Sequence, residues 1–171
     1  SLTIFSEGCH GANPHLCLDP IVVGAQAVLS LQVMVSRQLD VHHDTVITVG
    51  SFHAGSASNI IPQRADLLAT VRTYGADQRR AVREKVERTI AGVCQAAGAR
   101  CSFDYREGIP AAYNDPELTR RAAAVAARLL GAENVTQGEP RMVAEDFSYY
   151  GQEMPAALLW LGAEPKGSRA S

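Results

Sequence analysis

The chain has 171 residues, 46% hydrophobic and 20% charged, values ordinary for a globular protein with one large domain or one small domain plus part of another. Its formal net charge of −2 at pH 7 excludes a general electrostatic attraction to nucleic acid or to an anionic membrane. We expect no apolar run to reach the roughly 18–20 residues that span a bilayer. Residues 1–5 include no initiator Met and none of the features of a signal peptide, so we expect the natural N-terminus to lie upstream.

The first part of the chain predicts a strand and a helix. Residues 2–7 form a short strand that enters a loop rich in Gly, Asn and Pro over residues 8–14. Asp19 and Pro20 then begin a helix that runs to about Gln38, because Asp caps a helix and Pro fits its first position. This helix is apolar on most sides, so we expect a sheet to cover one side and something else, such as a partner subunit, to cover another. One of its apolar faces comprises Ile21, Ala25, Val28, Leu31 and Val35.

Two further strands and a second helix follow. The β-branched run 45–52 and the run 65–74 predict strands that pair antiparallel across a Gly/Ser/Ala loop. Asp77 is expected to cap the second helix and Gly98 to end it. A last strand over residues 101–105 gives the order strand–helix–strand–strand–helix–strand, the ferredoxin-like βαββαβ pattern of an α+β unit with two layers. The buried stripe of the second helix is predicted at Val82, Val86, Ile90 and Val93.

The remaining segment, 107–171, differs from this two-layer unit, which we expect to comprise residues 1–106. It predicts a helix capped at Asp115 and ended by Gly131. The run 156–161 (AALLWL) is apolar without alternation, as in a central strand covered on both faces. One helix and one such strand cannot cover each other on all sides, so the segment is predicted to be an incomplete part of a larger α/β domain. The predicted inward face of the helix comprises Leu118, Ala122, Val125 and Leu129.

Four cysteines, at positions 9, 17, 94 and 101, are predicted to be free thiols in a cytoplasmic protein. None forms a C-x-x-C pair, and a chain of this size needs no disulfide framework. Cys9, His10, His15 and Cys17 place four potential zinc ligands within nine residues, but the spacing C-H-x4-H-x-C matches no usual structural zinc pattern. The alternatives are a loop with packed thiols, or a His15 that points into an active site as a proton donor or oxyanion stabiliser.

Three other positions carry polar groups able to serve a site. Asn59 is either a loop residue or an amide that binds a carboxylate or oxyanion, and Arg72 either lies at a sheet edge or clamps a carboxylate. The adjacent Glu145 and Asp146 could ligate metal, act as a base, or cap the next turn. No phosphate-binding loop, Ser-His-Asp order or H-E-x-x-H motif is present.

Taken together, these motifs resemble the lid-domain opening of the zinc-dependent amidohydrolase and aminoacylase peptidases, a group that includes hippurate hydrolase, the indoleacetyl-amino-acid hydrolases and carboxypeptidase G. Two positions depart from the usual pattern of this group: Cys9 and Ala144 stand where glycine is usual. The ordered set is Gly8-Cys9-His10-Gly11-Ala12-Asn13-Pro14-His15, Asp19-Pro20, Val35-Ser36-Arg37, Val49-Gly50, Ala54-Gly55, Asn59-Ile60-Ile61-Pro62, Val71-Arg72-Thr73, Asn114-Asp115, Glu145-Asp146-Phe147-Ser148, Pro155 and Leu161-Gly162.

The resemblance implies a homodimeric enzyme that hydrolyses the amide bond of small N-acyl amino acids, hippurate among them. Two zinc ions per subunit would be bound by residues outside this sequence, so we expect no metal site and no activity in this chain alone. His15 would reach the partner subunit's active site and stabilise the oxyanion, while Asn59 and Arg72 would hold the substrate carboxylate. Glu145 and Asp146 would line the substrate pocket from a partial zinc-peptidase catalytic domain.

Two alternatives belong to other functional classes. The chain could be a dimerisation module without catalytic function, or a small metal-binding domain that uses Cys9, His10, His15 and Cys17. Metal analysis of the purified chain would separate the second alternative from the others.

Overall fold

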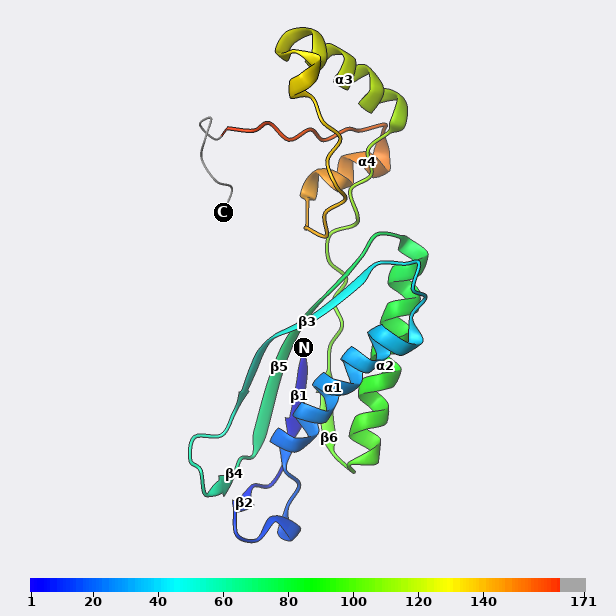
Figure 1. Cartoon of the computed structure of the whole chain (residues 1–171). Helices are drawn as coiled ribbons and strands as arrows, with labels where there is room; N and C mark the ends of the chain where they lie inside the picture. The colour runs from blue at the N-terminus through cyan, green and yellow to red at the C-terminus, as the bar shows by residue number, and fades with distance from the viewer. Residues whose placement is uncertain (164–171) are drawn as a thin grey trace. The chain divides into compact units, whose positions relative to one another are not determined.

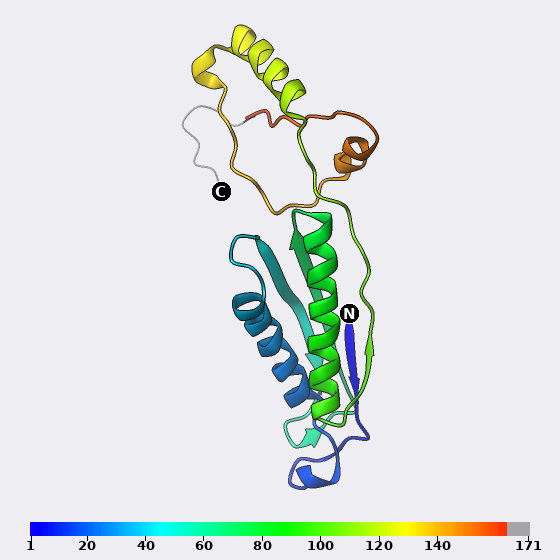
Figure 2. The same ribbon diagram turned by 90° about the vertical axis from the view of Figure 1, so that its right-hand side faces the viewer.

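The computed structural model describes residues 1–163, whose contacts separate a first unit, 1–108, from a second unit that begins at Ile109. The first unit has a four-stranded sheet in the order β3-β5-β1-β6, formed by β1 (Leu2–Phe5), β3 (Thr45–Ala54), β5 (Arg64–Thr73) and β6 (Arg100–Phe103). Strand β1 pairs antiparallel with β5 and β6, and β3 pairs antiparallel with β5. Two helices, α1 (Pro20–Gln38) and α2 (Ala76–Ala96), cover one face of the sheet (Figures 1 and 2). The predicted βαββαβ order is confirmed.

The core lies between the sheet and the two helices. The predicted stripe of α2 is confirmed, with all four of its residues at most 7% exposed. Of the five residues grouped on one face of α1, Ile21 and Ala25 are exposed and only Leu31 is fully buried, so the side packed on the sheet is offset from that face. A helix that is apolar all round gives no pattern that selects one face. The buried residues of the cluster are Leu2, Ile4, Val23, Ala27, Leu31, Met34, Ile47, Leu67, Val82, Val86, Ile90, Val93 and Cys94.

The ends of both helices follow local chemistry. Asp19 caps α1, its Oδ1 accepting hydrogen bonds from the backbone N–H of Ile21 at 2.9 Å and of Val22 at 3.4 Å. The prediction that Asp77 caps α2 is wrong: the cap is Gly75, and Asp77 lies in the first turn, paired with Arg80. A carboxylate in a first turn still interacts favourably with the positive end of the helix dipole.

By length and composition, α1 is long and apolar enough to cross a membrane, with a mean hydropathy of 1.3, so the expectation that no run reaches spanning length is wrong. This is weak support for a membrane span, because a core helix passes the same test. Val23, Ala27 and Met34 of α1 lie in the core of the first unit. Packing against the sheet therefore explains part of its apolar character.

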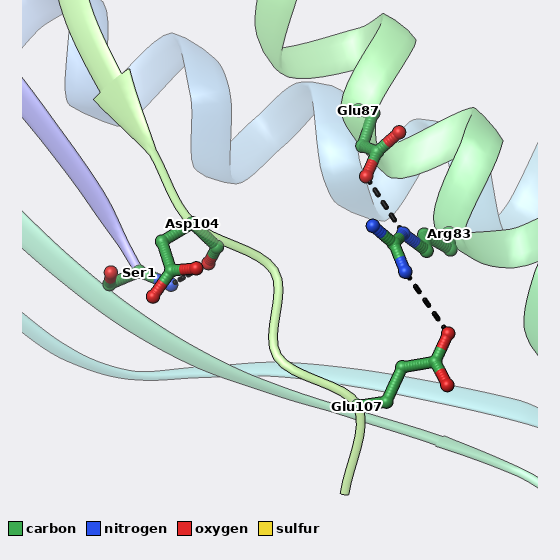
Figure 3. Close-up of polar contacts among 5 residues, drawn as sticks. All are labelled: Ser1, Arg83, Glu87, Asp104 and Glu107. Atoms are coloured by element: carbon green, nitrogen blue, oxygen red, sulfur yellow. Dashed lines mark hydrogen bonds and ion pairs between the residues drawn. The ribbon is translucent and has the colours of Figure 1, made fainter.

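The connection after β6 is tied to the side of α2. The guanidinium of Arg83 donates to Glu87 at 2.9 Å and to Glu107 at 3.0 Å, while the Ser1 amino group donates to the carbonyl of Asp104 at 2.7 Å (Figure 3). The Arg83 guanidinium also lies 5.4 Å from the ring centroid of Tyr105. The residue before β1 and the connection that follows β6 thus lie side by side.

The second unit contains α3 (Pro116–Leu130), α4 (Tyr150–Glu153) and the short 3-10 helices η2 (Ala132–Asn134) and η3 (Asp146–Tyr149). As predicted, Asp115 caps α3, its Oδ1 accepting from Leu118 N–H at 2.8 Å, and Gly131 ends it with a φ of 91°. Within residues 1–163 the predicted inward face of α3 is at most partly covered: Leu118 and Ala122 are half-buried, Val125 and Leu129 are exposed, and no residue of the helix is fully buried.

The strand predicted over residues 156–161 is absent. Asn114 exchanges two hydrogen bonds with the backbone of Leu158, at 2.8 and 3.0 Å, but no strand within residues 1–163 pairs with this segment. A strand requires a ladder partner for its backbone groups. Leu159, Trp160 and Leu161 are 55%, 68% and 82% exposed, so the described residues leave these apolar side chains largely uncovered.

Candidate functional site

His15 lies at one end of the sheet, on the loop that joins β1 to α1. It is part of η1 (Pro14–Leu16), where none of the three residues is buried. The two-residue strand β2 (Cys9–His10) pairs antiparallel with β4 (Ile60–Ile61) and so fastens this loop to the connection between β3 and β5. The imidazole of His15 is therefore exposed on a loop whose base is held by backbone pairing.

Asn59 lies beside the same loop. Its carbonyl accepts a hydrogen bond of 2.8 Å from the backbone N–H of Gly11, and the residue is exposed. A Cβ at position 11 would lie 3.1 Å from that carbonyl oxygen, which is tighter than ordinary contact. Glycine therefore permits the close approach of the two loops. The structure brings the segments that carry His15 and Asn59 together.

His10 supports the turn that follows it. Its Nδ1 accepts a hydrogen bond of 3.1 Å from the backbone N–H of Ala12, and its carbonyl accepts another, of 2.8 Å, from Asn13. These contacts give His10 a local structural role in the loop.

The four cysteines form two disulfides, Cys9–Cys17 and Cys94–Cys101, so the prediction of free thiols is wrong. Their Cα–Cα distances, 6.0 and 6.4 Å, lie in the range that a disulfide spans. Sequence spacing alone could not show these approaches, because each pair depends on a turn. The pairing of Cys9 with Cys17 also engages two of the four ligands of the hypothetical zinc site, and residues 1–163 hold no cluster of three metal-binding side chains.

Arg72 lies at the opposite end of the sheet from His15. It is half-buried on β5 opposite Val46 of β3, whereas Ala65, at the start of β5, faces Ala54 next to the loop of Asn59. Seven residues of strand separate Ala65 from Arg72, roughly 23 Å at the usual rise per residue. One copy of the chain therefore does not bring Arg72 and Asn59 to the same substrate carboxylate.

Arg72 also lies on the face of the sheet that the helices leave uncovered. Along β5 the buried Ala65 and Leu67 point toward the helices, and alternation places Arg72 on the other face. The chain leaves the first unit near this end, since the Arg79 guanidinium in the first turns of α2 donates to the carbonyl of Gly108 at 3.3 Å. Arg72 therefore lies near Gly108, where the chain leaves the first unit, and His15 lies at the opposite end of the sheet.

The same open face holds a polar cluster that the sequence did not predict. Asp66 accepts hydrogen bonds from Arg64 at 2.6 and 2.7 Å and from the hydroxyl of Thr3 at 2.7 Å. These bonds, that of Arg64 first, lower the pKa of the Asp66 carboxyl below its usual value. Alternation along β1 and β5 was the available signal, since Thr3 and Asp66 are direct partners in the register.

Glu145 and Asp146 lie in the second unit. The Glu145 carboxylate caps η3, accepting from the backbone N–H of Phe147 at 3.2 Å, so the capping alternative describes its contact here. Asp146 is exposed in the first turn of η3. Ser148 is 3% exposed, and its Oγ has no hydrogen-bond partner within the described part of the chain.

This two-layer unit with a histidine loop at one end corresponds to a known class of domain. Residues 1–97 match the family model described as the peptidase dimerisation domain. The chain belongs to the M20 family of peptidases.

Two relatives are deacetylases. The N-acetyldiaminopimelate deacetylase of Geobacillus is 34% identical over 158 residues, covering 92% of this chain and 42% of the relative. The N-acetylcysteine deacetylase of Bacillus subtilis is 32% identical over 161 residues, covering 94% and 42%. The chain spans about two fifths of the length of these relatives.

Two solved structures match both sequence and fold. One from methicillin-resistant Staphylococcus aureus has a TM-score of 0.82 and 32% identity, covering 98% of this chain and 43% of that chain. A Bacillus subtilis protein described as a dinuclear metal-binding M20 peptidase has a TM-score of 0.64 and 28% identity, covering 91% and 38%. The named relatives are therefore hydrolases, and one of them is described as binding a dinuclear metal centre.

Proposed function

We propose that this chain is part of an enzyme that hydrolyses the amide bond of small N-acyl amino acids, with hippurate-like compounds as candidate substrates. The deacetylases among its relatives act on molecules of this class by name. The observation that carries the proposal is the exposed His15 on a loop paired to Asn59, with Arg72 at the other end of the same sheet.

In this proposal His15 stabilises the transition state. An exposed imidazole on a fastened loop can donate an N–H to the oxygen that becomes negative when the amide carbonyl is attacked. Asn59, on the adjoining loop, donates its amide N–H to the same end of the substrate, and Arg72 binds the free carboxylate with its guanidinium.

The separation of Asn59 and Arg72 calls for two copies of the chain. Strand β3 lies at the edge of the sheet, with its outer backbone groups facing no other described strand. Antiparallel pairing of β3 with β3 of a second copy would place the Arg72 end of one sheet beside the Asn59 end of the other. Each site would then combine Arg72 of one copy with His15 and Asn59 of its partner.

The surface of α1 supports this homodimer. Val22, Leu29 and Val33 are 62%, 67% and 52% exposed, and spacings of seven and four place them on one helix face. We propose that this apolar face is the second side of α1, for which the sequence analysis expected a covering element such as a partner subunit. Pairing across β3 and α1 would bury it, as in other symmetric interfaces.

We also propose that Glu145 and Asp146 line the substrate pocket, and that two divalent metal ions, zinc by resemblance, are bound by residues of the full-length enzyme outside this sequence. The residues described here do not fit such a site, because they hold no cluster of three metal-binding side chains. The contribution assigned to this chain is therefore substrate binding, oxyanion stabilisation and dimerisation.

The test is a comparison of variants in the full-length enzyme with N-acetyl and N-benzoyl amino acids as substrates. His15→Ala should lower kcat by about 100–1000-fold with little change in KM, because one oxyanion donor acts mainly in the transition state. Arg72→Ala should raise KM for substrates with a free carboxylate and leave the corresponding amides almost unaffected. The opposite pattern in the two variants would refute these roles.

A further inference from the structure

The disulfide Cys9–Cys17 closes the loop that carries His15. The two cysteines are eight positions apart, with Cα atoms 6.0 Å apart, and His10 and His15 both lie between them. Cys9 belongs to β2, which is paired with β4, whereas Cys17 is extended backbone just before the cap of α1. The disulfide therefore joins the side of the loop that is held by β2–β4 pairing to the side that leads into α1.

Few other contacts hold the part of the loop near His15. Residues 11–16 are all exposed, with Leu16 at 69%. Gly11 is held by its hydrogen bond to the Asn59 carbonyl, but the backbone bonds beyond it are short-range: Asn13 N–H donates to the His10 carbonyl at 2.8 Å, and Leu16 N–H donates to the Asn13 carbonyl at 3.1 Å. Such exposed turns open easily when nothing buried anchors them. The covalent bond at the base is the strongest constraint on where η1 lies.

We propose that Cys9 and Cys17 are positioning residues whose disulfide holds His15 where it can stabilise the oxyanion, so that reduction of this bond lowers kcat. This inference rests on the proposed function of His15. The bond restricts the loop to few conformations, and a donor aimed at a developing oxyanion loses much of its effect when its position varies.

The chemical step is an exchange with a dithiol reductant, of the thioredoxin or small-dithiol class. A thiolate of the reductant attacks one sulfur of the Cys9–Cys17 bond and forms a mixed disulfide, and its second thiol then displaces the protein sulfur. Two electrons and two protons pass to Cys9 and Cys17, which become thiols, and the reductant becomes a disulfide. Both cysteines are half-buried and so within reach of a reductant. Disulfides of cytoplasmic proteins, the location expected from the sequence, are usually transient or redox-sensing.

The second disulfide provides a matched control. Cys94–Cys101 joins α2 to β6, its loop is of similar length, and Cys94 is only 8% exposed in the core. Its removal alters the packing of the first unit and leaves the His15 loop closed. The double variant C94A/C101A therefore separates a general loss of stability from a loss of His15 positioning.

The experiment uses the full-length enzyme reduced with a trialkylphosphine, which avoids the metal binding of dithiols, and follows each bond by alkylation and mass spectrometry. We expect kcat to fall on the order of 10-fold as Cys9–Cys17 is reduced, with KM changed by less than about 2-fold. C9A/C17A should have the low kcat from the start and no response to the phosphine, and C94A/C101A should respond like the natural enzyme. Full kcat after complete reduction, or in C9A/C17A, would overturn the proposal.

Hydrogen exchange on the present chain gives a second readout that does not depend on catalysis. Reduction should accelerate exchange at the amides of Asn13 and Leu16 by about 10-fold or more and leave those of β5 unchanged. Unchanged exchange at both loop amides would also overturn the proposal. If His15→Ala left kcat intact, the proposed function of His15 would fail, and hydrogen exchange would still decide whether the disulfide holds the loop.

Discussion

Mixing two impaired variants of the full-length enzyme tests whether its site is shared between two copies. In our proposal each site takes Arg72 from one copy and His15 from the partner, because roughly 23 Å of β5 separates their ends of the sheet. A mixed dimer of His15→Ala and Arg72→Ala subunits would then have one site with both residues intact and one site with neither. Random association makes about half of the dimers mixed, so about one quarter of all sites should be complete.

The assay measures hydrolysis of an N-acyl amino acid after the two variants have been denatured and refolded together, or coexpressed with different tags. Each variant alone should show little activity, and the mixture should recover about 25% of the natural value at a substrate concentration near its KM. Tandem purification through both tags should raise this to about 50%, since every dimer then has one complete site.

The control pairs His15→Ala with Asn59→Ala. These residues lie on loops joined by the Gly11–Asn59 hydrogen bond, so both belong to the same end of one copy. Their mixed dimer has one alteration in each site, and activity should not recover. Lack of recovery with His15→Ala and Arg72→Ala, in dimers shown to be mixed, would refute the shared site.

Three further outcomes are expected for the present chain. Leu29→Arg, on the exposed apolar face of α1, should convert dimer to monomer in sedimentation with little change in the free energy of unfolding; a stable dimer would move the interface elsewhere. Met34→Ala should lower the free energy of unfolding by about 2–5 kcal/mol in denaturant titrations, because Met34 is 0% exposed; a loss below ~1 kcal/mol would contradict its core position. Asp66→Asn should cost stability at pH 7 and less at pH 3. The pKa of Asp66 is lowered on folding, so its contribution is present above its unfolded value of about 3.8 and is lost as acid protonates it; an equal cost at both pH values would argue against the bond to Arg64.

The fold of the first unit could be predicted from the sequence because its local signals agree with one another. In α2, charged residues on one side and Val82, Val86 and Ile90 on the other identify the buried face without ambiguity. In α1 apolar residues occur on every side, and the sequence could not choose between the face toward the sheet and the face toward a partner. To choose, one would need to know what packs against the side of α1 that faces away from the sheet.

Contacts that depend on tertiary geometry could not be predicted. Cys9 and Cys17 meet only because β2 pairs with β4 and the loop turns back at η1. The apolar run 156–161 predicts a strand, but strand formation also needs neighbours that this segment does not have among the described residues. The residue types of the segment favour a strand, but whether a strand forms depends on a neighbouring strand to pair with.

The candidate site shows the same division. His15, Asn59 and Arg72 were selected by resemblance, since each has an ordinary structural alternative on its own. The sequence placed Asn59 and Arg72 on one substrate carboxylate, and only the register of β3 and β5 shows that a single copy keeps them apart. Their 13-residue separation says nothing about distance until the strand between them is known to be extended.

The adjacency of Ser1 and Asp104 has a consequence for how such domains are exchanged in evolution. The amino group of Ser1 lies 2.7 Å from the carbonyl oxygen of Asp104, so the residues that precede and follow the four-stranded sheet and its two helices are adjacent in space. A module whose two ends coincide can be grafted into a host polypeptide at a single surface position with little disturbance on either side. In our proposal this unit carries the dimer interface together with His15, Asn59 and Arg72, so transplanting residues 1–104 as a cassette between related hydrolases should alter pairing preference and substrate choice together.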